Sequence, residues 1–358
     1  VAGDLALQTA TIDGALDLLV ESGGLSSGII RATQGVTLAS LLGLGTEGAL
    51  SLTTPELTAQ TLGDLNVILN ARDGGTRLGR LFVQGGIDIA ATATDLTTLA
   101  DTEVLSLSSD VRIAAKSLTL SGGVTSAGGD VTLTSLGTLT MLSNSASVEA
   151  NGTASLSAEG DLRLSNVTGA LAEISTDGSL SLIALSDPET EAHITSSGLT
   201  TLRAGSITGA VPLTTRLAAL EAVVNSGDLR LTNTGALALR NAQAATGNLD
   251  IATRGAMVLS RAIAASGGTV TLSATGTLSG DAAMTAGRLD LTSSDGDITL
   301  TLANADTVTI SRASAEQGHI ALASQGAMEV GNLGAKTTLS LSAGGTGLRS
   351  MGTSMLSG

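Results

Sequence analysis

Apolar and polar residues alternate in short segments along the chain, and most of these segments begin at a glycine. The clearest copies begin at Gly227, Gly247 and Gly268. In the first copy Leu229 and Leu231 are separated by polar residues, and the other two copies show the same alternation. A period of two is typical of a strand that buries one face and exposes the other. Each copy therefore predicts a short strand directly after its glycine.

A longer period contains this alternation. The first glycines of the copies are 20 and 21 residues apart, and a second glycine follows eight residues after each, at Gly235, Gly255 and Gly276. A second alternating segment and an alanine-rich third segment follow that glycine. Fixed periods in this range are typical of solenoids, and helical repeats need about 33 residues or more. The sequence predicts an all-β fold, a parallel β-helix (β-solenoid) with three short strands per coil of about 20 residues.

The same pattern extends with irregular spacing through the rest of the chain. We expect residues 1–358 to form a single continuous β-solenoid with irregular insertions near 70–80, 186–224 and 302–317. The first insertion contains three arginines and is expected to be a protruding corner loop. Within the second, the apolar residues of 213–224 favour a strand, with a short amphipathic helix as the alternative. Both chain ends fall within repeat-like sequence, so we expect a segment of a longer protein.

Composition narrows the classes of function. The 358 residues include one Phe, no Trp, no Tyr and no Cys. A thin coil is filled well by aliphatic side chains, and the scarcity of aromatic rings disfavours sites that stack sugars or bases. The net charge of −15 disfavours nucleic acid and anionic membranes as partners. No apolar run approaches the length of about 18 residues that a membrane-spanning helix needs. We therefore expect neither nucleic-acid binding nor membrane insertion.

One acidic run offers weak candidates for a metal site. Asp187, Glu189, Glu191 and His193 occupy alternate positions, so a strand would place all four side chains on one face. Calcium takes several oxygen ligands, which makes a Ca²⁺ site conceivable here. The favoured interpretation is an exposed, solvated loop, and no metal site, cofactor site or catalytic residue is assigned.

Three other motifs carry chemistry in other proteins but have a simpler interpretation in this one. Gly43, Gly45 and Gly48 form a G-x-G-x-x-G pattern that no helix follows, so they are expected to be coil corners. Lys336 lacks the glycine spacing of a phosphate loop. Asp295 and Asp297 could act as paired carboxylates in glycan cleavage, although Asp-Gly-Asp more often forms a tight turn.

The repeats resemble a known family. The run GDLRLTNTGALALRNAQAATGNLDIATRGAMVLSRAIAASG is similar to the haemagglutinin-type β-helix repeats of filamentous haemagglutinin-like exoproteins. The shared features are small-residue glycine corners, L-x-L strands, alanine-rich third strands and no cysteine. The resemblance implies a right-handed parallel β-helix, a protein secreted by a two-partner route, and a location at the bacterial cell surface. It implies no site residues, because the repeats of that family are scaffold.

These observations lead to one main expectation and two alternatives. We expect a non-enzymatic extracellular β-helix rod, the stalk of a secreted adhesin or a building block of a surface filament. Its partners would be a host or neighbouring-cell surface, glycan or protein, with end-to-end self-association as a further possibility. The alternatives are a polysaccharide-active β-helix enzyme, a lyase or hydrolase, and a less favoured ice- or mineral-binding face of threonine columns.

Overall fold

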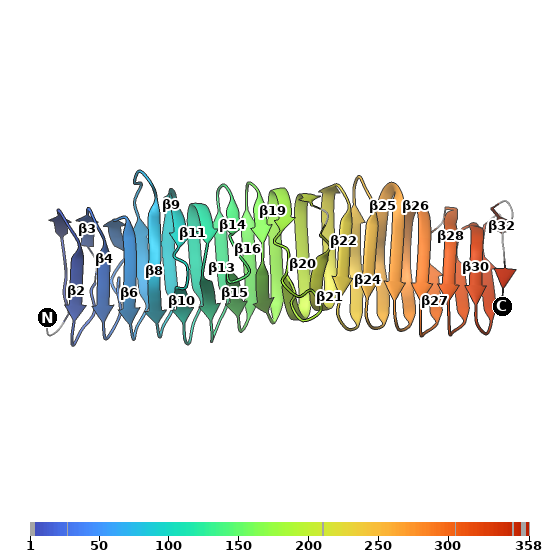
Figure 1. Cartoon of the computed structure of the whole chain (residues 1–358), viewed down its shortest axis with the longest axis horizontal. Coiled ribbons are helices and arrows are strands. Elements are labelled where there is room, and N and C mark those ends of the chain that lie inside the picture. The colour runs from blue at the N-terminus through green and yellow to red at the C-terminus, as the bar shows by residue number, and fades with distance from the viewer. Residues whose placement is uncertain are drawn as a thin grey trace. The chain divides into compact units, whose positions relative to one another are not determined.

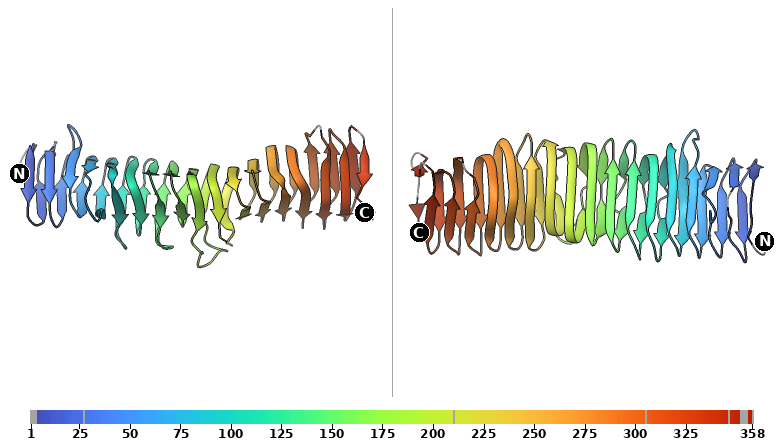
Figure 2. Two further views of the ribbon diagram at one scale, coloured as in Figure 1. Left: turned by 90° about the horizontal axis from the view of Figure 1, so that it is seen from above. Right: turned by 180° about the vertical axis from the view of Figure 1, so that it is seen from behind.

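The structure is a computed structural model that describes residues 4–26, 28–209, 211–304, 306–345, 347–351 and 356–357. Every regular element among these residues is a β-strand. The contacts divide the chain into two compact units, Val1–Ser186 and Asp187–Gly358. Figure 1 shows the strands of each unit side by side, and Figure 2 shows from two further sides that successive coils within a unit follow a similar course. The expectation of an all-β parallel β-solenoid is confirmed.

The first unit contains the first nineteen strands in chain order. They are β1 (Thr9–Ile12), β2 (Leu16–Val20), β3 (Gly28–Ala32), β4 (Val36–Ser40), β5 (Leu50–Thr53), β6 (Glu56–Thr61), β7 (Leu65–Leu69), β8 (Thr76–Val83), β9 (Ile87–Thr98), β10 (Glu103–Ser106), β11 (Val111–Leu120), β12 (Gly123–Ser126), β13 (Val131–Ser135), β14 (Leu139–Met141), β15 (Ser147–Ala150), β16 (Thr153–Ala158), β17 (Leu162–Leu164), β18 (Asn166–Gly169) and β19 (Leu171–Leu182).

The second unit contains the other fourteen. They are β20 (Ile194–Thr208), β21 (Leu213–Ser226), β22 (Leu229–Asn233), β23 (Leu237–Ala244), β24 (Leu249–Thr253), β25 (Met257–Ala274), β26 (Leu278–Ser293), β27 (Ile298–Leu302), β28 (Val308–Ala315), β29 (Ile320–Ser324), β30 (Met328–Ala335), β31 (Leu339–Ala343), β32 (Leu348–Ser350) and β33 (Leu356–Ser357).

Each strand pairs in parallel with the equivalent strand of the next coil. In the first unit the three strands β13, β14 and β15 of one coil pair with β16, β17 and β18 of the next. In the second unit β22 pairs with β24, and β24 pairs with the last part of β25. The offset between paired residues ranges from 17, for Leu50 with Val67, to 24, for Ile87 with Val111. The predicted coil of about 20 residues is therefore confirmed, with variable corners.

Some strands of the second unit are longer than the sequence pattern predicts, because they continue around a corner where the pattern predicts a break between two strands. β25 spans a second strand, a third strand and the first strand of the following coil. Arg261 lies at one of these bends with φ of 62°, a left-handed conformation that is uncommon for a residue with a side chain. The sequence pattern thus places the strands correctly, although the hydrogen-bonded ladder continues around some corners.

The core of each unit consists of columns of aliphatic residues stacked from coil to coil. Leu229, Leu249, Val270 and Leu289 form one such column, and each is at most 1% exposed. Burying a side chain of this size stabilises a fold by about 1.5–3 kcal/mol. The one aromatic ring, Phe82, faces outward between buried neighbours in β8. Placing this ring outside leaves the thin interior to aliphatic side chains.

The three expected insertions are narrower in the structure than in the sequence interpretation. Of the stretch 70–80, only residues 70–75 form a loop, and Thr76 already begins β8. Of 186–224, irregular backbone covers 186–193 and a short break after β20, while β20 and β21 form the rest. The strand interpretation of 213–224 is confirmed by β21, and the alternative helix is wrong because this segment pairs with β20 and β23 on either side.

The third stretch behaves in the same way. β27 ends at Leu302 and β28 begins at Val308, so most of the expected insertion at 302–317 is the strand β28. Its alternating side chains bury Val308, Ile310 and Ala313. Ala210 and Ala305, which fall within these two stretches, lie outside the described residues.

Candidate functional sites

The acidic run before β20 is a turn and not a strand. The Asp187 carbonyl accepts hydrogen bonds from the N–H groups of Thr190 (3.2 Å) and Glu191 (2.8 Å). The Asp187 carboxylate accepts from the Glu189 N–H (3.0 Å) and from the Thr190 hydroxyl (2.7 Å). The bonds to the carboxylate, first that from the Thr190 hydroxyl and then that from the Glu189 N–H, lower the pKa of the Asp187 carboxyl. Proline and aspartate both favour turns, so Pro188 after Asp187 explains why the alternation does not continue as a strand.

The turn does not bring the four candidate ligands together. The Glu189 carboxylate lies 3.4 Å from the Arg254 guanidinium. His193 is fully buried, and its Nδ1 accepts a hydrogen bond from the Thr214 N–H at 3.1 Å. Residues 187–190 form an exposed turn, in agreement with the favoured interpretation as a loop, although His193 is buried. The alternative strand, which would place all four side chains on one face, does not form. No group of three or more His, Cys, Asp or Glu in the described part of the chain could hold a metal ion.

The second candidate acidic pair lies in the bend before β27, where the Asp295 N–H donates to the Thr275 carbonyl at 2.8 Å. The Asp297 carboxylate accepts from the backbone N–H of His319 (2.9 Å) and lies 3.0 Å from its Nδ1. The Thr299 hydroxyl lies 3.4 Å from the other ring nitrogen of His319. The His319 ring thus lies between the Asp297 carboxylate and the Thr299 hydroxyl. However, the side chains of His319 and Asp297 are 40% and 39% exposed. Water screens such groups, so the alignment serves mainly to join two coils.

The glycine and lysine motifs lie at corners. Gly45 has φ of 80°, and its N–H donates to the Leu25 carbonyl of the preceding coil at 2.7 Å. The backbone N–H of Lys336 donates to the carbonyls of Ala315 (3.2 Å) and Gly318 (3.0 Å). The expectation that the three glycines are coil corners is confirmed.

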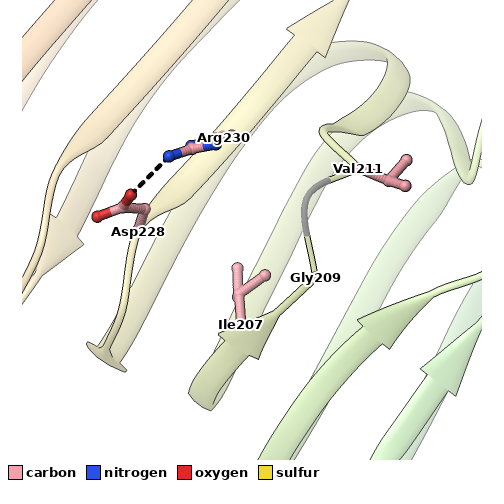
Figure 3. Close-up of a pocket in the computed structure, with 5 residues that line it drawn as sticks. All are labelled: Ile207, Gly209, Val211, Asp228 and Arg230. Carbon is pink, nitrogen blue, oxygen red and sulfur yellow. Dashed lines mark hydrogen bonds and ion pairs between the residues drawn. The ribbon is translucent and has the colours of Figure 1, made fainter.

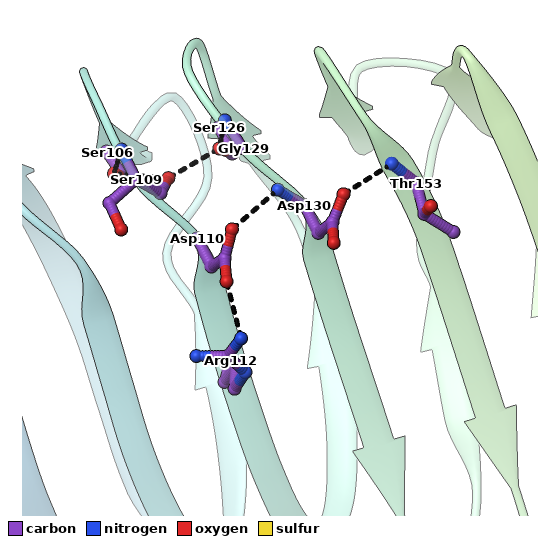
Figure 4. A network of polar contacts seen from close by, with 8 residues as sticks. All are labelled: Ser106, Ser109, Asp110, Arg112, Ser126, Gly129, Asp130 and Thr153. Atoms are coloured by element: carbon purple, nitrogen blue, oxygen red, sulfur yellow. Dashed lines mark hydrogen bonds and ion pairs between the residues drawn. The ribbon is translucent and has the colours of Figure 1, made fainter.

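Aspartates at the coil corners link successive coils, as Figure 4 shows for one part of the first unit. The Asp110 carboxylate accepts from the Asp130 N–H (3.0 Å), and the Asp130 carboxylate accepts from the Thr153 N–H (2.7 Å). Arg112 forms an ion pair with Asp110. The same contact recurs from Asp64 to Gly86, from Asp161 to Ser179, from Asp228 to Asn248 and from Asp297 to His319. The G-D pairs that open many coils in the sequence are therefore structural clamps.

Buried hydroxyl groups complete the same corners. The Ser126 hydroxyl donates to the Ser109 carbonyl at 2.6 Å and accepts from the Gly129 N–H at 2.9 Å. The Ser106 hydroxyl also donates to the Ser109 carbonyl, at 2.8 Å. Sequence reasoning missed these residues, although the signal is visible: a Ser, Thr or Asn often ends the strand that follows a glycine, as in GDVTLTS and GDLRLTN.

An open cleft of about 300 Å³ lies in the second unit and is shown in Figure 3. Ile207 and Val211 contribute apolar side chains, and Asp228 and Arg230 contribute an ion pair of 3.0 Å. Hydrogen bonding from the Asn248 N–H, with a smaller contribution from Arg230, lowers the pKa of the Asp228 carboxyl. The charged groups of this cleft already satisfy each other.

A second surface, in the first unit, was not expected from the sequence. We call it the leucine face and define it by the outward side chains of β2, β4, β6 and β8 together with the residues that follow these strands. Its two hollows, of about 250 and 280 Å³, share Gln60. Leu19, Leu41 and Leu62 are 56%, 46% and 53% exposed. The second hollow contains Arg80 and Phe82. The signal in the sequence is a leucine at an outward position, as in LDLLV.

These features define the class of protein. Both units are parallel β-solenoids whose corners are joined by carboxylate and hydroxyl groups. Residues 123–301 match the Toastrack DUF4097 family, and the chain belongs to that family. No curated protein and no solved structure matches the chain. None of the described residues form a helix that is long and apolar enough to cross a membrane.

Proposed function

We propose that this chain is a non-enzymatic structural rod of the bacterial cell surface, part of the stalk of a secreted adhesin or a building block of a surface filament. The observation that carries the proposal is the repeated clamp at the coil corners, in which an aspartate of one coil holds the backbone of the next in both units. A β-solenoid in which each coil is held only by its neighbours suits a stiff spacer. The resemblance to haemagglutinin-type repeats supports the extracellular setting.

The charge of the chain fits this role. A net charge of −15 disfavours nonspecific association, including contact with anionic membranes. A contact with a host or neighbouring-cell surface, whether glycan or protein, would then depend on local features rather than on bulk charge. Secretion by a two-partner route and end-to-end association of solenoids belong to the same proposal.

Imaging and binding together test the proposal. Negative-stain electron microscopy of the purified chain is expected to show uniform rods, and longer filaments at high concentration would support end-to-end association. Fluorescently labelled chain is expected to bind host cells or glycan arrays only through defined contacts that an excess of unlabelled chain displaces. Compact, non-elongated particles would contradict the rod.

The enzyme alternative has its own readout. The chain would be incubated with a panel of acidic and neutral polysaccharides, and new reducing ends and unsaturated products would be measured. We expect no product above that of heat-denatured chain. Cleavage that is lost in the variant Asp297→Asn would favour the polysaccharide-active enzyme over the structural rod.

A further inference from the structure

The leucine face presents four neighbouring rows of outward side chains. β2 pairs with β4, β4 with β6, and β6 with β8, and Figure 1 shows these strands side by side. The register aligns one column of side chains across them, Leu19, Ala39, Gln60 and Phe82. The exposed Leu41 and Leu62 follow the second and third of these strands directly. Leu19, Leu41 and Leu62 line one hollow of this patch, and Gln60 joins it to the hollow that contains Phe82.

The outward strand positions of the leucine face differ from most others in the first unit. Elsewhere the outward positions of the first unit are mostly Thr, Ser, Asn or charged, as at Thr132, Ser155 and Glu173. Contiguous exposed apolar surface commonly marks an interaction site. Its burial would stabilise a complex by about 25 cal/mol for each Å² that is removed from water.

The charges at the margin of the patch indicate what covers it. Arg80 is exposed, and its guanidinium lies over the Phe82 ring, 5.6 Å from the ring centre. Asp17 is exposed at the other end of the patch, two residues before Leu19. Neither Arg80 nor Asp17 has an ion-pair partner among the described residues. The last row of the patch thus carries Arg80, and the first row carries Asp17.

We propose that the leucine face binds the same face of a second copy of this chain, side by side and in opposite directions. The two-fold axis would run parallel to the strands, between the rows of β4 and β6. This operation places β8 of one copy opposite β2 of the other, and β6 opposite β4. Arg80 then faces Asp17 of the second copy, and Phe82 faces its Leu19.

The inner rows match as well. The larger Gln60 lies opposite the small Ala39 of the second copy. Leu62 lies opposite Leu41 of the second copy, so these two apolar side chains can contact each other. In a two-fold contact of this kind both copies contribute the same patch, so each pair of different residues, such as Arg80 with Asp17, forms twice. The charges disfavour the alignment in which the second copy is shifted by one coil. With the axis on the row of β6, Asp17 would face Glu103 of the second copy, and like charges oppose association.

The inference requires only the fold of the first unit and is independent of the extracellular role. It also differs from end-to-end association, because a two-fold side contact closes at two copies. Multi-angle light scattering coupled to size exclusion would measure the mass of the full chain over a range of concentrations. We expect twice the monomer mass of 35.0 kDa.

A charge exchange tests the alignment. Arg80→Glu and Asp17→Arg are each expected to weaken the dimer at least about tenfold, because each places like charges opposite each other. The double variant R80E/D17R restores opposite charges and is expected to restore the dimer. Arg163→Glu is the matched control, since it makes the same charge change at an exposed position of β17, outside the leucine face. It should leave the dimer unchanged.

Folding is checked by circular dichroism and thermal melting of every variant. Leu62→Ser is a second test that does not involve charge, and it should yield monomer with an unchanged melting temperature. The proposal is overturned if the unmodified chain is monomeric at all accessible concentrations. It is also overturned if R80E dimerises as strongly as the unmodified chain. The same holds if the double variant R80E/D17R dimerises no more strongly than the weaker of the two single variants. A mass that rises above that of two copies with concentration, and that is the same in the charge variants, would contradict the proposal and indicate end-to-end association.

Discussion

The carboxylate of Asp110 accepts a hydrogen bond from the backbone N–H of Asp130, twenty residues further along the chain, at 3.0 Å. Asp130 then repeats the contact with the Thr153 N–H at 2.7 Å. At a corner the backbone leaves the regular sheet ladder, and its N–H groups need other acceptors. The aspartates supply them and so extend coil-to-coil pairing into the corners.

Removing one of these carboxylates should weaken the stack locally. Asp130→Ala leaves the Thr153 N–H without its acceptor, and we expect the free energy of unfolding to fall by about 1 kcal/mol. Asp130→Asn keeps a carbonyl oxygen in place and should cost less. The chain itself supports this control, because Asn248 accepts from the Thr269 N–H at 2.8 Å. Urea unfolding measures both, and equal losses for the two variants would contradict the clamp.

The regular part of the fold could be predicted from the sequence because it depends on local pattern. Alternation after Gly227 and Gly247 predicts the strands, and the 20-residue spacing of these two glycines predicts the coil. The clamps and the leucine face depend on which residues meet between coils. Offsets from 17 to 24 residues shift that register from corner to corner, so they could not be derived without the structure.

The stretch 187–193 shows where the period-two pattern does not apply. Asp187, Glu189 and Glu191 alternate as in a strand, but alternation indicates a strand only where the polar positions are separated by buried residues, and the loop is the favoured interpretation. Here Pro188 and Thr190 separate them, and Asp187 closes a turn with its own neighbours. Local turn hydrogen bonds therefore outweigh the period-two pattern.

The Asp228 carboxyl should make stability depend on pH in acid. The Asn248 N–H lowers its pKa in the folded chain below the ordinary value of 3.8. A lowered pKa means that the contribution is fully present above the unfolded value and is lost as the pH falls through the folded value. Compared with Asp228→Asn, the unmodified chain should lose melting temperature more steeply below about pH 4. Parallel melting curves of the two proteins between pH 7 and 3 would contradict this.

Two glycines should respond differently to the same substitution. A Cβ at Gly63 would lie 1.7 Å from the carbonyl oxygen of Leu42, a backbone atom that cannot move away alone. A Cβ at Gly35 would lie no closer than 3.8 Å to any atom of another residue beyond its neighbours. We expect Gly63→Ala to destabilise by about 3 kcal/mol or more and Gly35→Ala by less than about 0.5 kcal/mol. Denaturant midpoints of the two variants provide the comparison.

Calcium should not stabilise the chain through the acidic turn. Both carboxylate oxygens of Asp187 already accept hydrogen bonds, and Glu189 pairs with Arg254. Ligand binding to the folded state would raise the melting temperature. We expect no shift in millimolar calcium, and the variant Asp187→Asn should respond as the unmodified chain does. A calcium-dependent rise in melting temperature that is lost in Asp187→Asn would contradict this prediction and support a metal site in the turn.

Asn233 should be the most sensitive polar residue of the second unit's interior. It is fully buried, and its Oδ1 accepts from the Leu217 N–H (2.8 Å) and the Thr215 hydroxyl (2.9 Å). Asn233→Leu fits the apolar surroundings but removes the acceptor of the Leu217 N–H, while the Thr215 hydroxyl keeps the Thr232 carbonyl at 3.4 Å. A buried unpaired donor costs about 1–3 kcal/mol. We therefore expect a loss of about 2 kcal/mol or more, measured by urea unfolding.

The control for this substitution is Asn332→Leu, which makes the same change at an exposed strand position and should alter stability by less than about 0.5 kcal/mol. Hydrogen exchange adds a local readout, because a solenoid unit is stabilised mainly by its nearest neighbours. In Asn233→Leu the amides of β21 and β22 should lose protection first, while those of β29 keep theirs. Uniform loss of protection across the second unit would show that its coils unfold together rather than coil by coil.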